Sequence, residues 1–125
     1  MWPSRHGSIK ANKGVIKTSY SIKGTNIDLT RGDTLKVTIN ITQDGEEYTP
    51  QDGDVVRFAM KRYYSDSDAL INKTIDNSTL LLELDPEDTK ELAFGAYVYD
   101  IEMTFANGDV DTFIKGKFTI TEEVI

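Results

Sequence analysis

Cysteine and histidine, the residues most often used in nucleophilic and general-base catalysis, are scarce in this 125-residue chain. There is no cysteine, which removes thiolate nucleophiles, thiolate metal sites and disulfides together. The single histidine, His6, lies near the N-terminus, in a segment separate from the sequence that we expect to form the folded body. A Ser-His-Asp or Cys-His arrangement therefore has no histidine to use on that body. We predict that the protein is not an enzyme and that it uses no metal or cofactor.

The 21 carboxylates offer other chemistry, but no spacing singles out a pair for it. Asp52 with Asp54, or Asp66 with Asp68, could supply oxygen ligands to Ca²⁺. Neither pair continues into the glycine and distant glutamate of an EF-hand loop, so solvated turn residues are the favoured interpretation. Two opposed carboxylates could also hydrolyse a glycoside, although a small sandwich leaves little room for a sugar cleft.

The remaining features suggest binding rather than catalysis. Tyr63 and Tyr64 are adjacent in an expected strand, so at least one of the two rings must face solvent. Exposed tyrosines are common at protein interfaces and on sugar-binding surfaces, although an edge tyrosine without a partner is equally compatible with the sequence. The triplet Arg31-Gly32-Asp33 resembles an integrin-binding tripeptide, but a tight turn with Gly32 at positive φ is the favoured interpretation.

Charge is distributed unevenly along the chain. Residues 1–24 contain five basic residues and no acid, whereas residues 25–125 contain the other nine basic and all 21 acidic residues, a net charge of −12. An acidic body repels a phosphate backbone, so nucleic acid is not an expected partner. The basic leader is interpreted either as a solvated segment or as an arm that docks on an acidic neighbour. The candidate interface residues are Trp2, Arg5, Lys10, Lys13, Tyr63 and Tyr64.

Apolar and polar residues alternate over much of the chain, which is typical of strands with one buried face. The clearest run places Leu35, Val37, Ile39 and Ile41 on one side. Further strands are predicted at 15–23, 27–29, 55–64, 70–75, 79–84, 95–105 and 110–121. Asp44-Gly45 and Asn107-Gly108 favour tight hairpins. Gly116, inside the last strand, is expected to mark a bulge.

One segment interrupts this β pattern. Asp85 is suited to cap a helix that has Pro86 at its first position, and Glu87 and Asp88 suit the positive end of the helix dipole. We expect a short helix near residues 86–92, with Leu92 folded under the sheets. The predicted fold class is therefore all-β, an antiparallel β-sandwich of about seven to eight strands with one short helix; a closed barrel is the alternative.

The length fits one domain, which we place at residues 25–125, preceded by the leader at residues 1–24. The leader is expected to be flexible or to add an extra strand. No stretch reaches the roughly 18 to 20 apolar residues needed to cross a bilayer, so membrane insertion is not expected. Tyr97 and Tyr99 are interpreted as core aromatics whose hydroxyls reach backbone groups, in the manner of a tyrosine corner.

From Asn26 to about residue 121, the order of motifs resembles that of a known family. The motifs are Ile27–Leu35, Val56–Arg62, Leu84–Thr89, Gly95–Glu102 and Gly116–Ile120. Together they are similar to short Ig-like domains of phage and prophage tail proteins, and in particular to the N-terminal domain of the baseplate upper protein family. The resemblance implies an Ig-like β-sandwich that has no catalytic residues.

The resemblance also implies a role in assembly. We expect a non-enzymatic structural component of a tail or baseplate, made in the bacterial cytoplasm and built into the virion tail. Its expected partners are other tail or baseplate proteins and further copies of itself, in a homo-oligomer. It is either a stand-alone small tail component or one domain of a larger protein. The alternative is a carbohydrate- or cell-surface-binding Ig-like module, in which exposed aromatic rings would converge on a concave face beside loop acids.

Overall fold

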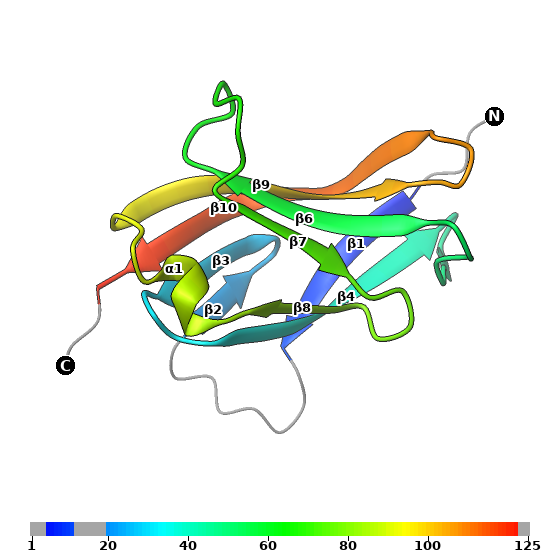
Figure 1. Cartoon of the computed structure of the whole chain (residues 1–125). Helices are drawn as coiled ribbons and strands as arrows, with labels where there is room; N and C mark the ends of the chain where they lie inside the picture. Colours follow the sequence, from blue (N-terminus) through cyan, green and yellow to red (C-terminus); the bar gives the residue numbers. More distant parts are fainter. Residues whose placement is uncertain (1–4, 12–19, 123–125) are drawn as a thin grey trace.

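The alternating side chains are arranged in two layers of β-strand around one core. The computed structural model describes residues 5–11 and 20–122, which contain ten strands and one helix (Figure 1). The first sheet contains β1 (Arg5–Ala11), β4 (Leu35–Gln43), β5 (Glu46–Glu47) and β8 (Leu81–Leu84). The second has the order β2 (Tyr20–Lys23), β3 (Asn26–Thr30), β10 (Val110–Thr121), β9 (Gly95–Thr104), β6 (Val55–Lys61) and β7 (Ile71–Ile75). The fold is nearly all-β and sandwich-like, as predicted.

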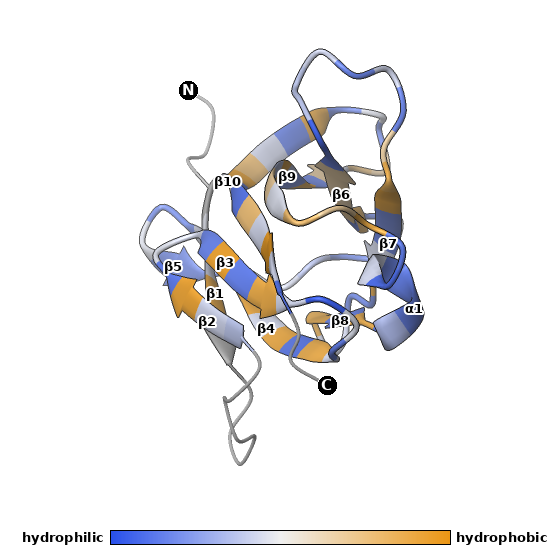
Figure 2. Cartoon of the chain, turned by 90° about the vertical axis from the view of Figure 1, so that its left-hand side faces the viewer, coloured by the Kyte–Doolittle hydropathy of each residue, from blue (hydrophilic) through white to orange (hydrophobic). Residues whose placement is uncertain are grey.

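The strand faces follow the sequence pattern closely. Figure 2 shows hydrophobic and hydrophilic residues alternating along β3 and β4. Val56, Phe58 and Met60 on β6 are fully buried, which confirms their predicted inward orientation. The turn at Asp44-Gly45 joins β4 to β5, and φ is +52° at Asp44 and +85° at Gly45. Two successive positive φ angles are the signature of the tight hairpin turn that an Asp-Gly pair favours.

The strand pairing departs from the prediction in two ways. β3 and β10 pair in parallel, with Ile27 opposite Phe118, whereas the other strand pairs in the described residues are antiparallel. Ten strands are present, where about seven to eight were expected. The two without a local signal are β1, where Ile9 is the only large apolar residue, and β5, which has two residues.

The predicted bulge at Gly116 is wrong. Gly116 lies in regular register opposite Tyr99, and the pairing between β9 and β10 shifts instead between Thr112 and Ile114. Glycine is needed at position 116 for lack of space, since a Cβ there would lie 2.9 Å from Cε1 of Tyr99 and against the Thr25 carbonyl oxygen. The Tyr99 hydroxyl donates a hydrogen bond to that same carbonyl. Close approach of a neighbouring backbone is the second reason for a glycine inside a strand.

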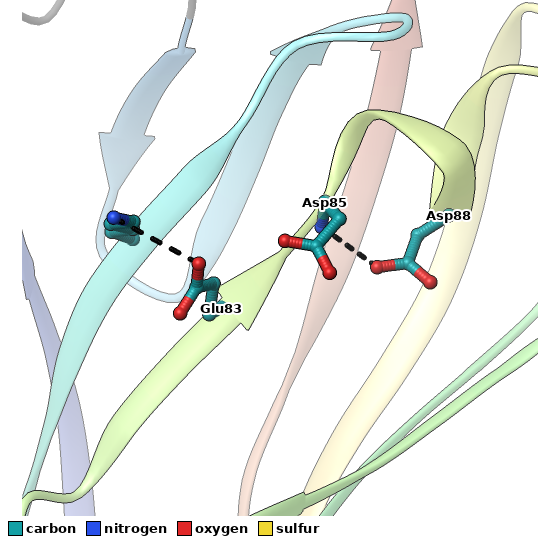
Figure 3. A network of polar contacts seen from close by, with 4 residues as sticks. Glu83, Asp85 and Asp88 are labelled. Carbon is teal, nitrogen blue, oxygen red and sulfur yellow. Dashed lines mark hydrogen bonds and ion pairs between the residues drawn. The ribbon is translucent and has the colours of Figure 1, made fainter.

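The predicted helix is present as a single turn, α1 (Pro86–Thr89), which ends before the expected residue 92. The Asp88 carboxylate accepts a hydrogen bond of 2.8 Å from the backbone N–H of Asp85, as Figure 3 shows. This contact is half of a capping box and supports the first turn of the helix. Leu92 packs partly buried against the core, as predicted. No helix within the described ranges is long and apolar enough to span a bilayer.

Aromatic side chains fill the centre of the molecule. The rings of Phe58, Tyr99 and Phe118 form a cluster in which the ring centroids lie 5.4 to 6.3 Å apart. The Tyr97 hydroxyl donates a hydrogen bond of 2.7 Å to the carbonyl of Ala93, four residues earlier. Both tyrosines are therefore core aromatics with hydroxyls on backbone groups, and Tyr97 makes the contact that defines a tyrosine corner.

Two parts of the basic leader are strands of the sandwich. β1 pairs with β4 from Arg5 opposite Gln43 to Ala11 opposite Val37, and β2 pairs with β3. Ile9 and Tyr20, one from each strand, are buried in the core. Deleting residues 1–24 would therefore remove one strand from each sheet, so such a deletion would disturb the fold as well as any docking arm.

Candidate functional site

The predicted interface residues lie in separate parts of the chain. Trp2 and Lys13 fall outside the described residues. Arg5 and Lys10 lie on β1, the strand that also carries His6 and pairs with β4. Tyr63 and Tyr64 lie in the loop that follows β6, a strand of the other sheet.

Two of the four predicted loop acids, Asp54 and Asp66, accept hydrogen bonds that shape turns. Asp54 is buried, and its carboxylate accepts hydrogen bonds of 2.8 Å from the Gln51 N–H and 3.1 Å from the Tyr48 hydroxyl. These bonds hold the loop before β6 in shape. Among the residues that the structure describes, no three His, Asp or Glu side chains are grouped so that they could hold a metal ion.

The Arg31-Gly32-Asp33 triplet forms the turn that the sequence predicts. Gly32 has φ of +81°, and the Asp33 N–H donates a hydrogen bond of 3.1 Å to the carbonyl of Thr30. The Arg31 guanidinium lies 4.1 Å from the centroid of the Phe94 ring, and its Nη1 donates a hydrogen bond of 3.3 Å to the carbonyl of Leu92. The arginine is thus used to join the turn to the segment after α1.

Among the residues that the structure describes, exposed large apolar side chains gather on the segment between β6 and β7, residues 62–70, which we call the tip loop. Figure 1 shows it projecting from the six-stranded sheet. Tyr63 is 62% exposed, Tyr64 is 67% exposed and Leu70 is 52% exposed. The prediction that Tyr63 and Tyr64 belong to a strand is wrong, because β6 ends at Lys61. Once the chain leaves the sheet, neither ring is directed into the core.

Hydrogen bonds order the tip loop internally. Asp66 closes a turn with Tyr63 in both directions, since its carboxylate accepts from the Tyr63 N–H at 3.0 Å and its own N–H donates to the Tyr63 carbonyl at 3.1 Å. The Lys61 ammonium donates a hydrogen bond of 2.7 Å to the carbonyl of Asp66. At the other end, the Leu70 N–H donates to the carbonyl of Met60 at 2.8 Å. The exposed rings are therefore carried by a shaped loop.

Arg62 fastens the start of the tip loop to β9. Its guanidinium carbon lies 4.6 Å from the centroid of the Tyr97 ring and 5.9 Å from that of Tyr63. Contacts of this kind are attractive because the face of an aromatic ring is electron-rich. Gly95 leaves the room for this arrangement, since a Cβ there would lie 3.0 Å from a terminal guanidinium nitrogen of Arg62.

A hollow of about 350 Å³ lies on the outer face of the six-stranded sheet, beside the tip loop. We call it the outer groove. Its lining consists of Arg57, Ala59, Lys61, Tyr64, Asn72, Val98, Tyr99, Asp100 and Glu102. Most of these residues occupy outward-facing positions on β6, β7 and β9, and Tyr64 reaches the hollow from the tip loop.

Strand register explains where the groove lies. Ala59 is paired with Asn72 on one side and with Asp100 on the other, so a small residue separates two polar ones. In the next row, Arg57 is paired with Glu102. The methyl group of Ala59 leaves space above the sheet that the longer neighbours surround.

The polar side chains around the groove are open to a ligand. Within the described residues, the side chains of Arg57, Asn72, Asp100 and Glu102 form no hydrogen bond or ion pair with one another or with other residues. Partial burial raises the pKa of the Asp100 carboxyl, and the ammonium groups of Lys115 and Lys61 partly offset this effect. Asp100 is therefore a partly desolvated carboxylate that a hydrogen-bond donor would stabilise.

Sequence reasoning identified Tyr64 but missed the rest of this groove. Period-two alternation places Arg57 and Ala59 on one outward face and Asp100 and Glu102 on another. The pattern does not say that β6 and β9 are neighbours, nor in which register they pair. The sequence of each strand shows which residues face outward, but it does not show that the two outward faces lie side by side.

No protein-family model matches the chain, and no curated protein matches it either. Its function must therefore be inferred from its own side chains.

Proposed function

We propose that this chain is a non-enzymatic structural component of a phage or prophage tail or baseplate that works by binding neighbouring tail proteins. The tip loop is the observation that carries the proposal, because it presents Tyr63, Tyr64 and Leu70 to solvent. Tyrosine is enriched at protein interfaces, where its ring supplies apolar area and its hydroxyl a polar contact.

The energetics of the tip loop favour a protein partner. Burying a large apolar side chain is worth about 1.5 to 3 kcal/mol, so covering Tyr63 and Leu70 together would contribute several kcal/mol to a complex. The hydrogen bonds of Asp66 and Lys61 already shape the loop. A shaped loop loses less conformational entropy on binding than a flexible one, and more of the contact energy appears as affinity.

The edge of the sheet next to the loop is less suited to assembly. β7 is an edge strand, but Lys73 at its centre is paired with Phe58 and points toward the core side, where it forms an ion pair with Asp88. An inward-pointing charge on an edge strand discourages pairing with a further strand. Docking through side chains of the tip loop is therefore favoured over strand addition at β7.

Other features support a structural role. The only buried carboxylate among the described residues is that of Asp54, which is already hydrogen-bonded to Tyr48 and Gln51. The sandwich, the one-turn helix and the Tyr97 corner agree with the resemblance to Ig-like tail domains. In this proposal the protein is made in the bacterial cytoplasm and enters the virion tail as a homo-oligomer.

The test is co-expression with the products of the genes beside this one, followed by co-purification. The proposal expects tail or baseplate genes as neighbours, and a complex with at least one of their products. The double variant Tyr63→Ser/Leu70→Ser should weaken that complex at least tenfold, since a loss of about 1.4 kcal/mol already reduces affinity tenfold.

Val110→Ser is the matched control, because Val110 is also an exposed apolar residue, 58% accessible, but lies on β10 away from the tip loop. Light scattering on purified protein measures the homo-oligomer independently. A monomer encoded away from any tail gene, or a complex indifferent to the double variant, would contradict the proposal.

A second candidate function, a carbohydrate- or cell-surface-binding module, is favoured by one observation. The Tyr64 ring lies at a hollow that also has carboxylate, amide and guanidinium groups around it. An aromatic ring beside hydrogen-bonding groups is the combination with which proteins bind sugars.

A further inference from the structure

The outer groove has the composition of a site for a small, uncharged, polar ligand. Its lining contains two cations, Arg57 and Lys61, and two carboxylates, Asp100 and Glu102. Within the lining these charges balance, and Lys115, paired with Asp100 across β9 and β10, adds one positive charge beside it, so a polycation is not favoured by the field of the site. A ligand with many groups that both donate and accept hydrogen bonds would satisfy both kinds of side chain.

We propose that the outer groove binds a neutral saccharide of one or two rings, with Tyr64 stacked on a sugar face and Asp100, Asn72 and Arg57 bonded to its hydroxyls. This inference rests on the second candidate function; it shares Tyr64 with the tip loop, whereas Tyr63 and Leu70 lie outside the groove lining.

The row Asn72–Ala59–Asp100 supplies the base of the site. Because Ala59 is paired with both polar residues, their side chains flank the space above its methyl group. Neighbouring hydroxyls of a sugar ring can then reach a carboxylate on one side and an amide on the other. Carboxylates only accept hydrogen bonds, whereas an amide both donates and accepts, so the two walls distinguish hydroxyl orientations.

Arg57 and Glu102 extend the site along the strands. They form the row next to Asp100 and are paired with each other across β6 and β9. Neither side chain is committed to an intramolecular hydrogen bond or ion pair within the described part of the chain. A sugar that engages them therefore need not break an existing contact first. Hydrogen bonds to charged groups are the stronger class.

Tyr64 completes the site from above. It is 67% exposed, so most of the side chain is accessible to a ligand, and it reaches the groove from a loop that Asp66 and Lys61 hold in shape. The C–H face of a pyranose ring is apolar and packs well on an aromatic ring. The volume of about 350 Å³ lies near the lower end of small-molecule sites. It suits one or two sugar rings rather than a long chain.

The test is an NMR titration of the ¹⁵N-labelled chain. The probes are the methyl glycosides of glucose, galactose, mannose, rhamnose, N-acetylglucosamine and N-acetylgalactosamine, with maltose and diacetylchitobiose, each taken to roughly 50 mM to reveal millimolar binding. We expect at least one sugar to cause saturable shifts of amides in β6, β7 and β9 around Ala59, Asn72 and Asp100.

Two variants locate the site and one controls for it. Tyr64→Ala and Asp100→Asn should each weaken binding at least tenfold, whereas Tyr63→Ala should leave it unchanged. Spectra of the free variants, superimposable on that of the parent away from the substitution, will show that each is folded. Glycylglycine serves as a zwitterionic probe.

Saturable shifts with glycylglycine but with no sugar would overturn the proposal. So would the absence of saturation by every sugar, or sugar binding that survives Tyr64→Ala. The assembly role is tested separately, because the Tyr63→Ser/Leu70→Ser variant retains every residue of the outer groove. Loss of the protein complex with retained sugar binding, or the reverse, assigns each failure to its own proposal.

Discussion

Lys73 and Asp88 form an ion pair in which Nζ lies 3.0 Å from Oδ2, and this contact links edge strand β7 to helix α1. Asp88 also accepts the hydrogen bond from the Asp85 N–H that caps the helix. The Asp88 carboxylate therefore supports the first turn of α1 and also holds α1 against strand β7. The two contributions can be separated by substitution.

Asp88→Ala should lower the free energy of unfolding by about 1 to 2 kcal/mol, because it removes both the capping hydrogen bond and the ion pair. Asp88→Asn keeps an oxygen that can accept from Asp85 and should cost less than about 1 kcal/mol, the value of a partly exposed ion pair. Urea denaturation measures both. Glu87→Ala, at an exposed neighbouring position, is the control. Equal losses of stability in Asp88→Ala and Asp88→Asn would show that the capping hydrogen bond contributes nothing.

Tyr99 predicts a loss of stability at high pH. Burial raises the pKa of its hydroxyl above the usual value of 10.0. The folded state therefore holds the proton more tightly than the unfolded state, and the resulting stabilisation is complete below pH 10 and lost as the pH rises further. The free energy of unfolding should fall by up to about 1.4 kcal/mol per pH unit from this one group. Tyr99→Phe should show a shallower decline between pH 10 and 11.5, while Tyr64→Phe should follow the parent.

Gly7 tests the packing of the N-terminal strand. A Cβ at position 7 would lie 2.6 Å from Cδ2 of Phe113 and would also meet the Ile114 side chain on β10. Gly7→Ala should therefore destabilise the protein by about 1 to 3 kcal/mol through overpacking. Ser8→Ala, at an exposed position on the same strand, should change stability by less than about 0.5 kcal/mol. Equal thermal midpoints for the two variants would mean that β1 does not pack against β10.

Replacing Asp100 should increase the stability of the fold by an amount that depends on pH. Burial raises its pKa above 3.8, so the carboxyl stabilises the fold below that pH and this contribution is lost as the pH rises through the folded-state pKa. Asp100→Asn removes the desolvated charge. The variant should therefore gain stability relative to the parent at pH 7 and lose that advantage at pH 3. Denaturation curves at the two pH values measure the difference, and a gain larger at pH 3 would contradict the assigned cause.

The faces of the strands could be predicted because they depend on neighbours in the sequence. Leu35, Val37, Ile39 and Ile41 alternate with polar residues, and this period of two decides which side is buried. The helix start at Asp85 and the turns at Asp44 and Asn107 were also predictable, since each rests on a few consecutive residues.

The two misplaced features have different causes. Gly116 is required by the Thr25 backbone and the Tyr99 ring, not by a bulge in its own strand. The tyrosines at 63 and 64 are exposed because the strand ends at Lys61, which local β-propensity did not reveal. At Gly116 contacts with distant residues outweigh the local pattern, whereas hydrogen bonds between nearby residues shape the loop that carries the tyrosines.

The sequence by itself determined an all-β chain, the inward and outward residues of its main strands, a capped helical turn, the absence of cysteine and the presence of a single histidine. Only the tertiary structure decided that β1 joins β4, that β3 lies parallel to β10, and that Asn72, Ala59 and Asp100 share one row. The physical reason is the distance along the chain over which the deciding interactions act. Burial of a face is set by the hydrophobicity of nearby residues, whereas strand order and register follow from the best packing of the whole core. The hydrogen bond from the Lys117 N–H to the Asn26 side chain, 91 positions away, is one product of that packing.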